Sequence, residues 1–381
     1  MNFLEAGSME ERLELMEHFA SRFYKRAQEV DEKGAFPYDN IRELVDSGYT
    51  TLMIPKDFGG KEISLYEFVR LQEIMASGDG STALSVGWHM CVVYQIFEKR
   101  TWPAGMMERI ANEIHSGALL NNAASERETG SPTRGGRPVT TAKRESGGWL
   151  INGRKIFTTL APMLDYFIVS ASIDETGEIG NFLIPRMTSG VMVEETWDSI
   201  AMRGTGSHDL VLENVRLGEE ALVEKFVPGK KAPNGGLLHV PACYLGIASA
   251  AKSYAVEFAK QYAPNSIEGT IIQLPEVQRK IGQMELLYMQ SKHFLHSVAK
   301  LWDASGKEGR KELGPELAAA KTSVVNASVK IVDIAMRVVG AGSLSMKCPL
   351  QRYYRDVRAG LHNPPMDDVV LKNLAARAAS R

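Results

Sequence analysis

Residues 147–161 read GGWLINGRKIFTTLA, and the chain changes there from a helical to an extended pattern. Gly147–Gly148 and Asn152–Gly153 bracket a short apolar run, and Gly-Gly and Asn-Gly pairs are typical of tight turns between antiparallel strands. The strand-like pattern extends over three further segments, at residues 166–170, 182–184 and 209–215. Residues 118–227 are therefore predicted to form a middle domain of mostly antiparallel β-sheet.

The chain before this region, residues 1–117, has the spacing of helices. Large apolar side chains recur there at intervals of three and four residues: Leu13, Met16, Phe19 and Phe23. Ser64, with Glu67 three residues later, has the pattern of a capping box and predicts that a helix begins at this point. We expect an N-terminal helical domain.

Long helical patterns return after a stretch rich in Gly, Pro and Lys at residues 228–236. Apolar residues keep helical spacing from Ile247 to Phe258 and again from Val277 to Val298, and a third pattern follows Pro315. Three long helices favour an antiparallel bundle over residues 228–381. The whole chain is therefore predicted to be an α+β multi-domain protein in the order helical, β, helical.

The composition excludes several classes of protein. The 381 residues carry 44 Lys and Arg against 46 Asp and Glu, so the net charge is 44 − 46 = −2. This balance argues against nucleic acid as a partner, because such binders usually carry a basic excess. The N-terminus lacks the pattern of a secretory signal, and no apolar run approaches the roughly 18 residues of a membrane span. We expect a cytoplasmic globular protein.

The sequence offers no candidate metal site and no common nucleotide motif. Its three cysteines lie far apart, without the spacing of a disulfide framework or of zinc ligands. His293 and His296 lie three residues apart but have no acidic or cysteine partner spaced to complete a site. The chain also lacks a Walker loop and a GxGxxG after a strand, which excludes phosphoryl transfer and a Rossmann domain.

Several motifs occur in an order that resembles the acyl-CoA dehydrogenase family of flavoproteins, along nearly the whole chain. Residues 125–131, SERETGS, resemble the T-E-P-x-A-G-S loop of that family, and residues 148–161 resemble its G-x-x-x-x-G-x-K-x-W-I-T-N-A segment. Residues 202–215 fit its late hairpin, and residues 353–358, YYRDVR, resemble its L-Y-R-D-A-R helix. The resemblance implies a C-terminal four-helix bundle and bound FAD, with FMN as the alternative.

The resemblance also implies which residues hold the flavin. Those along the isoalloxazine ring and the pantetheine side would be Ala124, Ser125, Gly130 and Ser131. Those on the other face would be Phe157, Thr158 and Thr159, with Phe157 where the family usually has Trp; an aromatic face and hydroxyl donors suit a flavin ring. Gly340 and Gly342 would face the FAD pyrophosphate of a neighbouring subunit, which implies a homo-oligomer, usually a tetramer. Taken alone, these glycines are equally typical of a helix C-cap.

The motif for the catalytic base departs from the family pattern. The family removes a substrate α-proton with a glutamate, and counting eight residues from Asp356 places Pro364 at that position. Some members carry the glutamate at the start of the first bundle helix, where this chain has Gly236 in a glycine pair. Neither proline nor glycine can accept a proton. A dehydrogenase of this sequence would need another base, and the candidates are His362, Asp367 and Asp368.

Three functions fit the resemblance, and we expect the first of them because it is the commonest chemistry of the family. The first is α,β-dehydrogenation of an acyl-CoA thioester in fatty acid metabolism, with hydride transfer to flavin N5 and an electron-transfer protein as partner. The second is a monooxygenase of the same fold, supplied with reduced flavin by a separate reductase and acting on a small sulfur or nitrogen compound. That branch has a histidine two residues before a proline, as in His362 and Pro364. There His362, with His89, would donate a hydrogen bond to the oxygen activated on the flavin. The third is an inactive flavin-binding scaffold.

Overall fold

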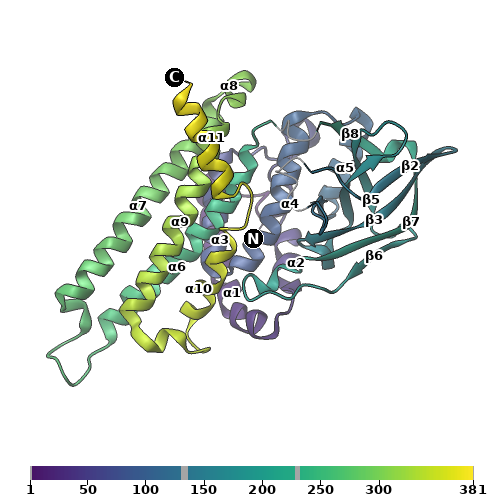
Figure 1. The fold of residues 1–381 in the computed structure, drawn as a ribbon. Helices are drawn as coiled ribbons and strands as arrows, with labels where there is room; N and C mark the ends of the chain where they lie inside the picture. Colours follow the sequence, from purple (N-terminus) through teal and green to yellow (C-terminus); the bar gives the residue numbers. More distant parts are fainter. Residues whose placement is uncertain (1, 130–135, 228–231, 381) are drawn as a thin grey trace.

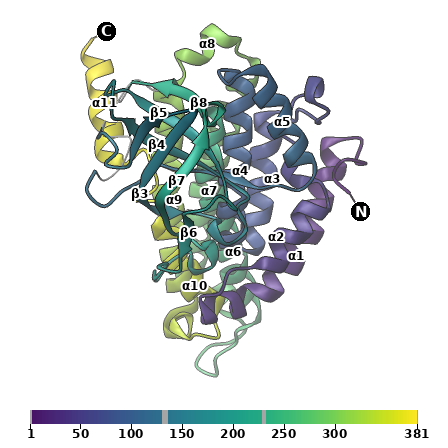
Figure 2. The same ribbon diagram turned by 90° about the vertical axis from the view of Figure 1, so that its right-hand side faces the viewer.

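A computed structural model describes residues 2–129, 136–227 and 232–380 of the chain. Figure 1 shows a helical N-terminal part, a β-sheet at one side and long helices at the other, which confirms the predicted order. The N-terminal helices lie between the sheet and the long helices (Figures 1 and 2). In the described part of the chain, no helix is both long and apolar enough to cross a membrane.

The N-terminal part contains five helices. They are α1 (Met9–Lys33), α2 (Tyr38–Asp46), α3 (Leu65–Gly78), α4 (Gly80–Lys99) and α5 (Ala104–His115). The Ser64 hydroxyl accepts a hydrogen bond from the Glu67 N–H at 3.1 Å, so α3 begins at the predicted cap. The Glu67 carboxylate forms a buried ion pair with Arg12 of α1, which joins these two helices.

The middle part is an eight-stranded sheet. Its strands are β1 (Leu120–Ala123), β2 (Thr141–Glu145), β3 (Gly148–Thr158), β4 (Tyr166–Ile173), β5 (Ile179–Pro185), β6 (Val191–Glu194), β7 (His208–Gly218) and β8 (Leu222–Phe226). The strand order is β6-β7-β3-β2-β4-β5-β8, and β1 pairs with β4. The pairings of β1 and β2 with β4 are parallel, and all the other ladders are antiparallel.

The two predicted turn signals of this region have different structures. The hairpin between β2 and β3 turns next to Gly147, which has a φ of 83°. Asn152–Gly153 lies instead inside β3, where the register against β7 shifts between Ile151 and Gly153. A side chain at Gly153 would collide with Thr140, so glycine is required there by a close approach and not by a turn.

The C-terminal part is built on three long helices, α6 (His239–Gln261), α7 (Pro275–Ala304) and α9 (Gly314–Val339), which pack side by side. Shorter helices complete it: α8 (Lys307–Lys311), α10 (Pro349–Ala359) and α11 (Asp367–Ala379). Helix α6 also packs against α3 and α4, so the apolar core continues from the bundle into the N-terminal helices. This shared core fixes the bundle relative to the rest of the chain.

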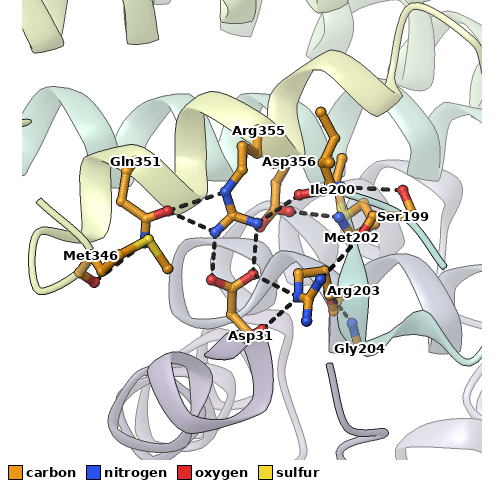
Figure 3. A network of polar contacts seen from close by, with 12 residues as sticks. Asp31, Ser199, Ile200, Met202, Arg203, Gly204, Met346, Gln351, Arg355 and Asp356 are labelled. Carbon is orange, nitrogen blue, oxygen red and sulfur yellow. Dashed lines mark hydrogen bonds and ion pairs between the residues drawn. The ribbon is translucent and has the colours of Figure 1, made fainter. Parts of the chain in front are cut away.

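A network of polar contacts joins all three parts (Figure 3). The Arg355 guanidinium of α10 donates to the Asp31 carboxylate of α1, with Nη1 3.0 Å from Oδ1, and to the Ile200 carbonyl at 2.6 Å. The neighbouring Asp356 carboxylate accepts the Met202 N–H at 2.6 Å, and the Arg203 Nε donates to the Asp31 carbonyl at 2.6 Å. The segment from Ile200 to Arg203 follows β6, so this network fixes a loop of the sheet against helices from both ends of the chain.

The substitution Asp31→Asn tests this network. Asp31 is only 5% exposed, and losing its charge leaves Arg355 without its ionic partner, so we expect unfolding free energy to fall by about 3 kcal/mol. Asp39→Asn is the matched control, because Asp39 and Arg42 form an exposed pair at 3.9 Å that contributes less than about 0.5 kcal/mol. Urea unfolding measures both. Equal midpoints for the two variants would show that the network does not hold the parts together.

Candidate functional site

A cavity of about 1340 Å³ lies where the sheet, α4 and the C-terminal helices meet. The sheet side contributes Ser125, Phe157 and Thr159, and α4 contributes Leu84 and Trp88. The opposite wall comes from α9 and from residues 362–366, the loop between α10 and α11. All three parts of the chain line this cavity, so the site exists only when they are assembled.

Three hydroxyl groups form a chain along the sheet side of the cavity. The Thr159 hydroxyl lies 2.9 Å from that of Ser207, which lies 2.8 Å from that of Thr205. Thr205 donates its proton to the Met202 carbonyl at 3.0 Å, so Ser207 donates to Thr205 and Thr159 donates to Ser207. The lone pairs of Thr159 are then left to accept a hydrogen bond from a ligand N–H in the cavity.

Two aromatic side chains stand beside these hydroxyls. Phe157 is 61% exposed and has a left-handed backbone with a φ of 57°, which turns its ring away from the core of the sheet. It meets Trp197 edge to face, with ring centroids 6.2 Å apart, and both rings line the cavity. Thr158 points the opposite way into the protein, where its hydroxyl is buried.

A buried ion pair supports the loop that carries Ser125. The Glu126 carboxylate accepts hydrogen bonds from the Lys155 ammonium at 2.5 Å, the Thr140 hydroxyl at 2.6 Å and the Val139 N–H at 2.6 Å. Burial alone would raise the pKa of Glu126, but the hydrogen bonds from Lys155 and Thr140 outweigh it and lower that pKa to about 2. The loop after β1 is therefore fixed to β3 by a carboxylate that is charged at neutral pH.

The structure brings some of the predicted flavin residues to the cavity. Ala124 and Ser125 line it, together with Phe157 and Thr159. Thr158 is not in the lining. Gly130 and Ser131 lie outside the described residues.

The other two predicted flavin glycines lie away from the cavity. Gly340 is the C-cap of α9, with a φ of 74° and its N–H bonded to the Met336 carbonyl, and Gly342 follows in a 3₁₀ turn. A side chain at either glycine would meet nothing within 4 Å. The space beside both is open, and their predicted contact with a partner's flavin stays a prediction.

The candidate catalytic residues differ in whether they line the cavity. His362 and Pro364 line the cavity. Asp367 begins α11 outside the lining, where its carboxylate accepts from the Asn326 amide at 2.7 Å. Asp368 follows it on the exposed side of the helix.

His89 is a buried residue of α4 and does not line the cavity. Its Nδ1 accepts the Leu120 N–H at 3.1 Å, and its Nε2 lies 3.2 Å from the Thr50 carbonyl, which suits the Nε2–H tautomer. Burial lowers the pKa of His89 to about 4, so the ring is neutral at pH 7. These contacts give His89 a place in the packing of α4 against β1.

Sequence reasoning missed Lys321 of α9. Its side chain is buried and lines the cavity, 3.9 Å from the Asp367 carboxylate. No motif marks this lysine, and a single charged residue on an amphipathic helix is usually solvated. Thr205 and Ser207 lay within a recognised motif, but the chain of hydroxyls they complete depends on the fold.

No metal centre accompanies these residues. Among residues 2–129, 136–227 and 232–380, no group of three or more His, Cys, Asp or Glu side chains is arranged to hold a metal ion. A planar aromatic cofactor fits the site better. The exposed ring of Phe157 and the half-buried ring of Trp197 offer apolar contact, and Thr159 offers a hydrogen-bond acceptor at the same wall. These are the features that a flavin ring requires.

Comparison with known proteins gives three consecutive matches to one family. The N-terminal, middle and C-terminal domains of acyl-CoA dehydrogenase match residues 9–100, 121–215 and 234–361. The chain is 49% identical to YdbM of Bacillus subtilis, provisionally named an acyl-CoA dehydrogenase, over 99% of this chain and 98% of that protein.

Two solved structures share the fold. Butyryl-CoA dehydrogenase of Megasphaera elsdenii has a TM-score of 0.86 at 21% identity and covers 100% of both chains. The methanesulfinate monooxygenase MsuC of Pseudomonas fluorescens has a TM-score of 0.85 at 23% identity and covers 96% of both chains. One fold thus accommodates both a dehydrogenase and a monooxygenase.

The substitution Glu126→Gln tests the support of the Ser125 loop. Removing one partner of a buried pair leaves the Lys155 charge uncompensated, so we expect about 3–5 kcal/mol lower stability at pH 7 and weaker flavin retention. Because the folded-state pKa of Glu126 is depressed, the stabilisation is full above the unfolded pKa of about 4.5 and is lost as the pH falls towards 2. The difference in thermal stability between wild type and variant should therefore be largest at pH 7 and should narrow as the pH falls from about 4.5 to about 3.

The control is Glu128→Gln, the same change two residues along at an exposed position. It should leave both stability and flavin retention within the range of surface substitutions. A Glu126→Gln protein as stable as this control at pH 7 would contradict the role given to the ion pair.

Proposed function

Because this chain belongs to the acyl-CoA dehydrogenase family, we propose that it is a flavin-dependent oxidoreductase that oxygenates a small sulfur or nitrogen compound. The flavin is FAD or FMN, and a separate reductase supplies it in reduced form. The protein works as a homo-oligomer. The proposal rests on which residues occupy the two positions from which the family takes its catalytic base.

Neither base position carries a carboxylate. Pro364 lines the cavity at the first. At the second, Gly236, an added Cβ would lie 3.1 Å from the Cys91 sulfur and 3.2 Å from the Tyr94 ring, so a side chain there would require these neighbours to shift. Proton abstraction from a substrate carbon has no obvious acceptor at either place.

The carboxylates that do line the described cavity are engaged elsewhere. Glu126 is bound to Lys155, and Glu98 lies 3.5 Å from Arg310. Glu224 accepts from the Asn181 amide and the Thr101 hydroxyl, both at 3.1 Å. The described lining therefore holds no free carboxylate, the kind of base that this family uses for α-proton removal, and this favours oxygenation over dehydrogenation.

The residues present suit oxygen chemistry. A bound flavin would supply the two-electron redox chemistry. Phe157 and Trp197 would hold the ring by apolar contact, and Thr159 would orient its edge by accepting a hydrogen bond. His362 lines the opposite wall, where its imidazole nitrogens can donate or accept a hydrogen bond.

Dehydrogenation of an acyl-CoA remains a second candidate for two reasons. The name of YdbM places that relative, 49% identical to this chain, with the dehydrogenases. Asp367 also has a buried carboxylate oxygen, Oδ1, without a hydrogen-bond partner among the described residues. This oxygen lies 3.9 Å from the Nζ of Lys321, which lines the cavity.

Two experiments, one anaerobic and one aerobic, distinguish oxygenation from dehydrogenation. We expect acyl-CoA thioesters of increasing length to leave the visible absorbance of the oxidised holoenzyme unchanged. We expect the reduced holoenzyme, mixed with labelled oxygen and a panel of small sulfides, sulfinates and amines, to transfer one labelled atom to a product. Rapid bleaching by an acyl-CoA without reductase would replace the proposal with dehydrogenation.

The substitution His362→Ala tests the proton donor of the oxygenation. A positioned acid or base contributes about 10²–10⁴-fold to a rate, so product formation should fall by at least about 100-fold while oxygen is still consumed and released as hydrogen peroxide. His293→Ala, an exposed histidine of α7, is the matched control and should keep the wild-type ratio of product to oxygen consumed. Unchanged coupling in His362→Ala would exclude His362 from this role.

A further inference from the structure

Lys321 is a buried cation that the proposed chemistry does not use. Its residue is 3% exposed, and its Nζ makes no hydrogen bond to any described residue. The free-energy cost of burying an ammonium is normally offset by ion pairs and hydrogen bonds, so one without a hydrogen bond beside a cavity indicates a site prepared for a ligand.

The wall around Lys321 is apolar. On α9, Leu317 and Ala318 precede it by one turn and line the same cavity. Leu238 and Met366 line the cavity from neighbouring segments of the C-terminal part. A charged group in such surroundings interacts strongly with an opposite charge, because little water screens it.

The nearest carboxylate satisfies Lys321 only in part. The Asp367 Oδ1 lies 3.9 Å from the Lys321 Nζ, too far for a hydrogen bond, and the other oxygen of Asp367 already accepts from Asn326 at 2.7 Å. Burial lowers the pKa of Lys321, and Asp367 acts against that change by favouring the ammonium. Asp367 is therefore an ionic neighbour of Lys321 that leaves the hydrogen-bond donors of its Nζ available to another group.

The other cations of the cavity lining are either paired more closely or not buried, and the second group is Lys99 and Lys307. Arg355 is bound to Asp31, and the Arg358 guanidinium lies 2.8 Å from the Asp333 carboxylate. Lys225 and Lys311 are paired with surface carboxylates at 2.6 and 2.7 Å. Lys321 thus differs from them in being both buried and without a hydrogen bond.

We propose that the Lys321 ammonium binds an anionic oxygen of the substrate, as in a carboxylate, sulfinate or phosphate group, at the end of a small apolar body. The inference rests on the cavity being the substrate site, as proposed above, but on neither of the two reactions. Leu317, Ala318 and Met366 would contact the apolar body while Lys321 selects its charge.

Binding to the oxidised holoenzyme tests this without turnover. Hexanoate and hexanamide have the same length and differ in charge, so calorimetry should show the wild type binding hexanoate about 10–100-fold more tightly. Lys321→Met keeps the stem of the side chain and removes its charge. It should weaken hexanoate binding by about 10–100-fold and change hexanamide binding by less than about 3-fold.

Two further variants control for structural effects. Lys330→Met makes the same change at an exposed position of α9 and should leave both affinities unchanged. Asp367→Asn removes the carboxylate that competes for Lys321 and should tighten hexanoate binding several-fold. The affinities for adipoyl-CoA and hexanoyl-CoA, which differ by a terminal carboxylate, are then compared in the same way. This second comparison distinguishes a free anionic substrate from one bound to CoA.

Two outcomes would overturn the proposal. If Lys321→Met and Asp367→Asn lower the urea midpoint equally and leave the preference for hexanoate intact, the pair is only structural. If Lys321→Met weakens binding of FMN but not of riboflavin, the anion is the flavin phosphate and not the substrate. If the protein binds hexanoate more tightly than hexanamide but does not oxygenate any compound of the panel, only the proposed reaction is contradicted and the role of Lys321 stands.

Discussion

The contact between the Arg355 guanidinium and the Asp31 carboxylate joins residues more than three hundred positions apart, and the cavity depends on it. Arg355 also binds the Ile200 carbonyl, and Asp356 binds the Met202 N–H, so one helix of the C-terminal part fixes the loop after β6. Ile200 and Met202 line the cavity. Without these bonds a wall of the site would be a free surface loop, whose position the sheet alone does not determine.

Charge inside the cavity is distributed unevenly, and this distribution restricts its chemistry. The acidic side chains of its described lining are held by Lys155, Arg310 and neutral donors, whereas Lys321 retains unused donors. A carboxylate that is already paired is a poor base for carbon acids, and an anion-binding site needs a cation with donors to spare. The same arrangement therefore supports both proposals, oxygenation and an anionic substrate.

Sequence reasoning was strongest where one residue type satisfies a local requirement. Ser64 caps α3 as its spacing with Glu67 predicts, and Gly340 ends α9 as a glycine after a long apolar pattern predicts. It was weaker where a glycine can serve more than one purpose. Asn152–Gly153 has the pattern of a turn, yet it lies within β3, where a glycine is needed because Thr140 approaches it closely. The role of Lys321 had no local signal, since its burial comes from α11 and the wall of the cavity.

The sequence by itself determined the order of helical, β and helical parts, because hydrophobic periodicity and turn residues act over short distances. It also determined that residues 364 and 236, the positions that the resemblance assigns to the base, are a proline and a glycine, because residue identity needs no fold. Only the tertiary structure decided that Glu126 forms an ion pair with Lys155. It also decided that His89 packs away from the cavity and that Lys321 lines it. Burial and pairing set the charge and reach of an ionisable side chain, and both arise from residues distant in the chain.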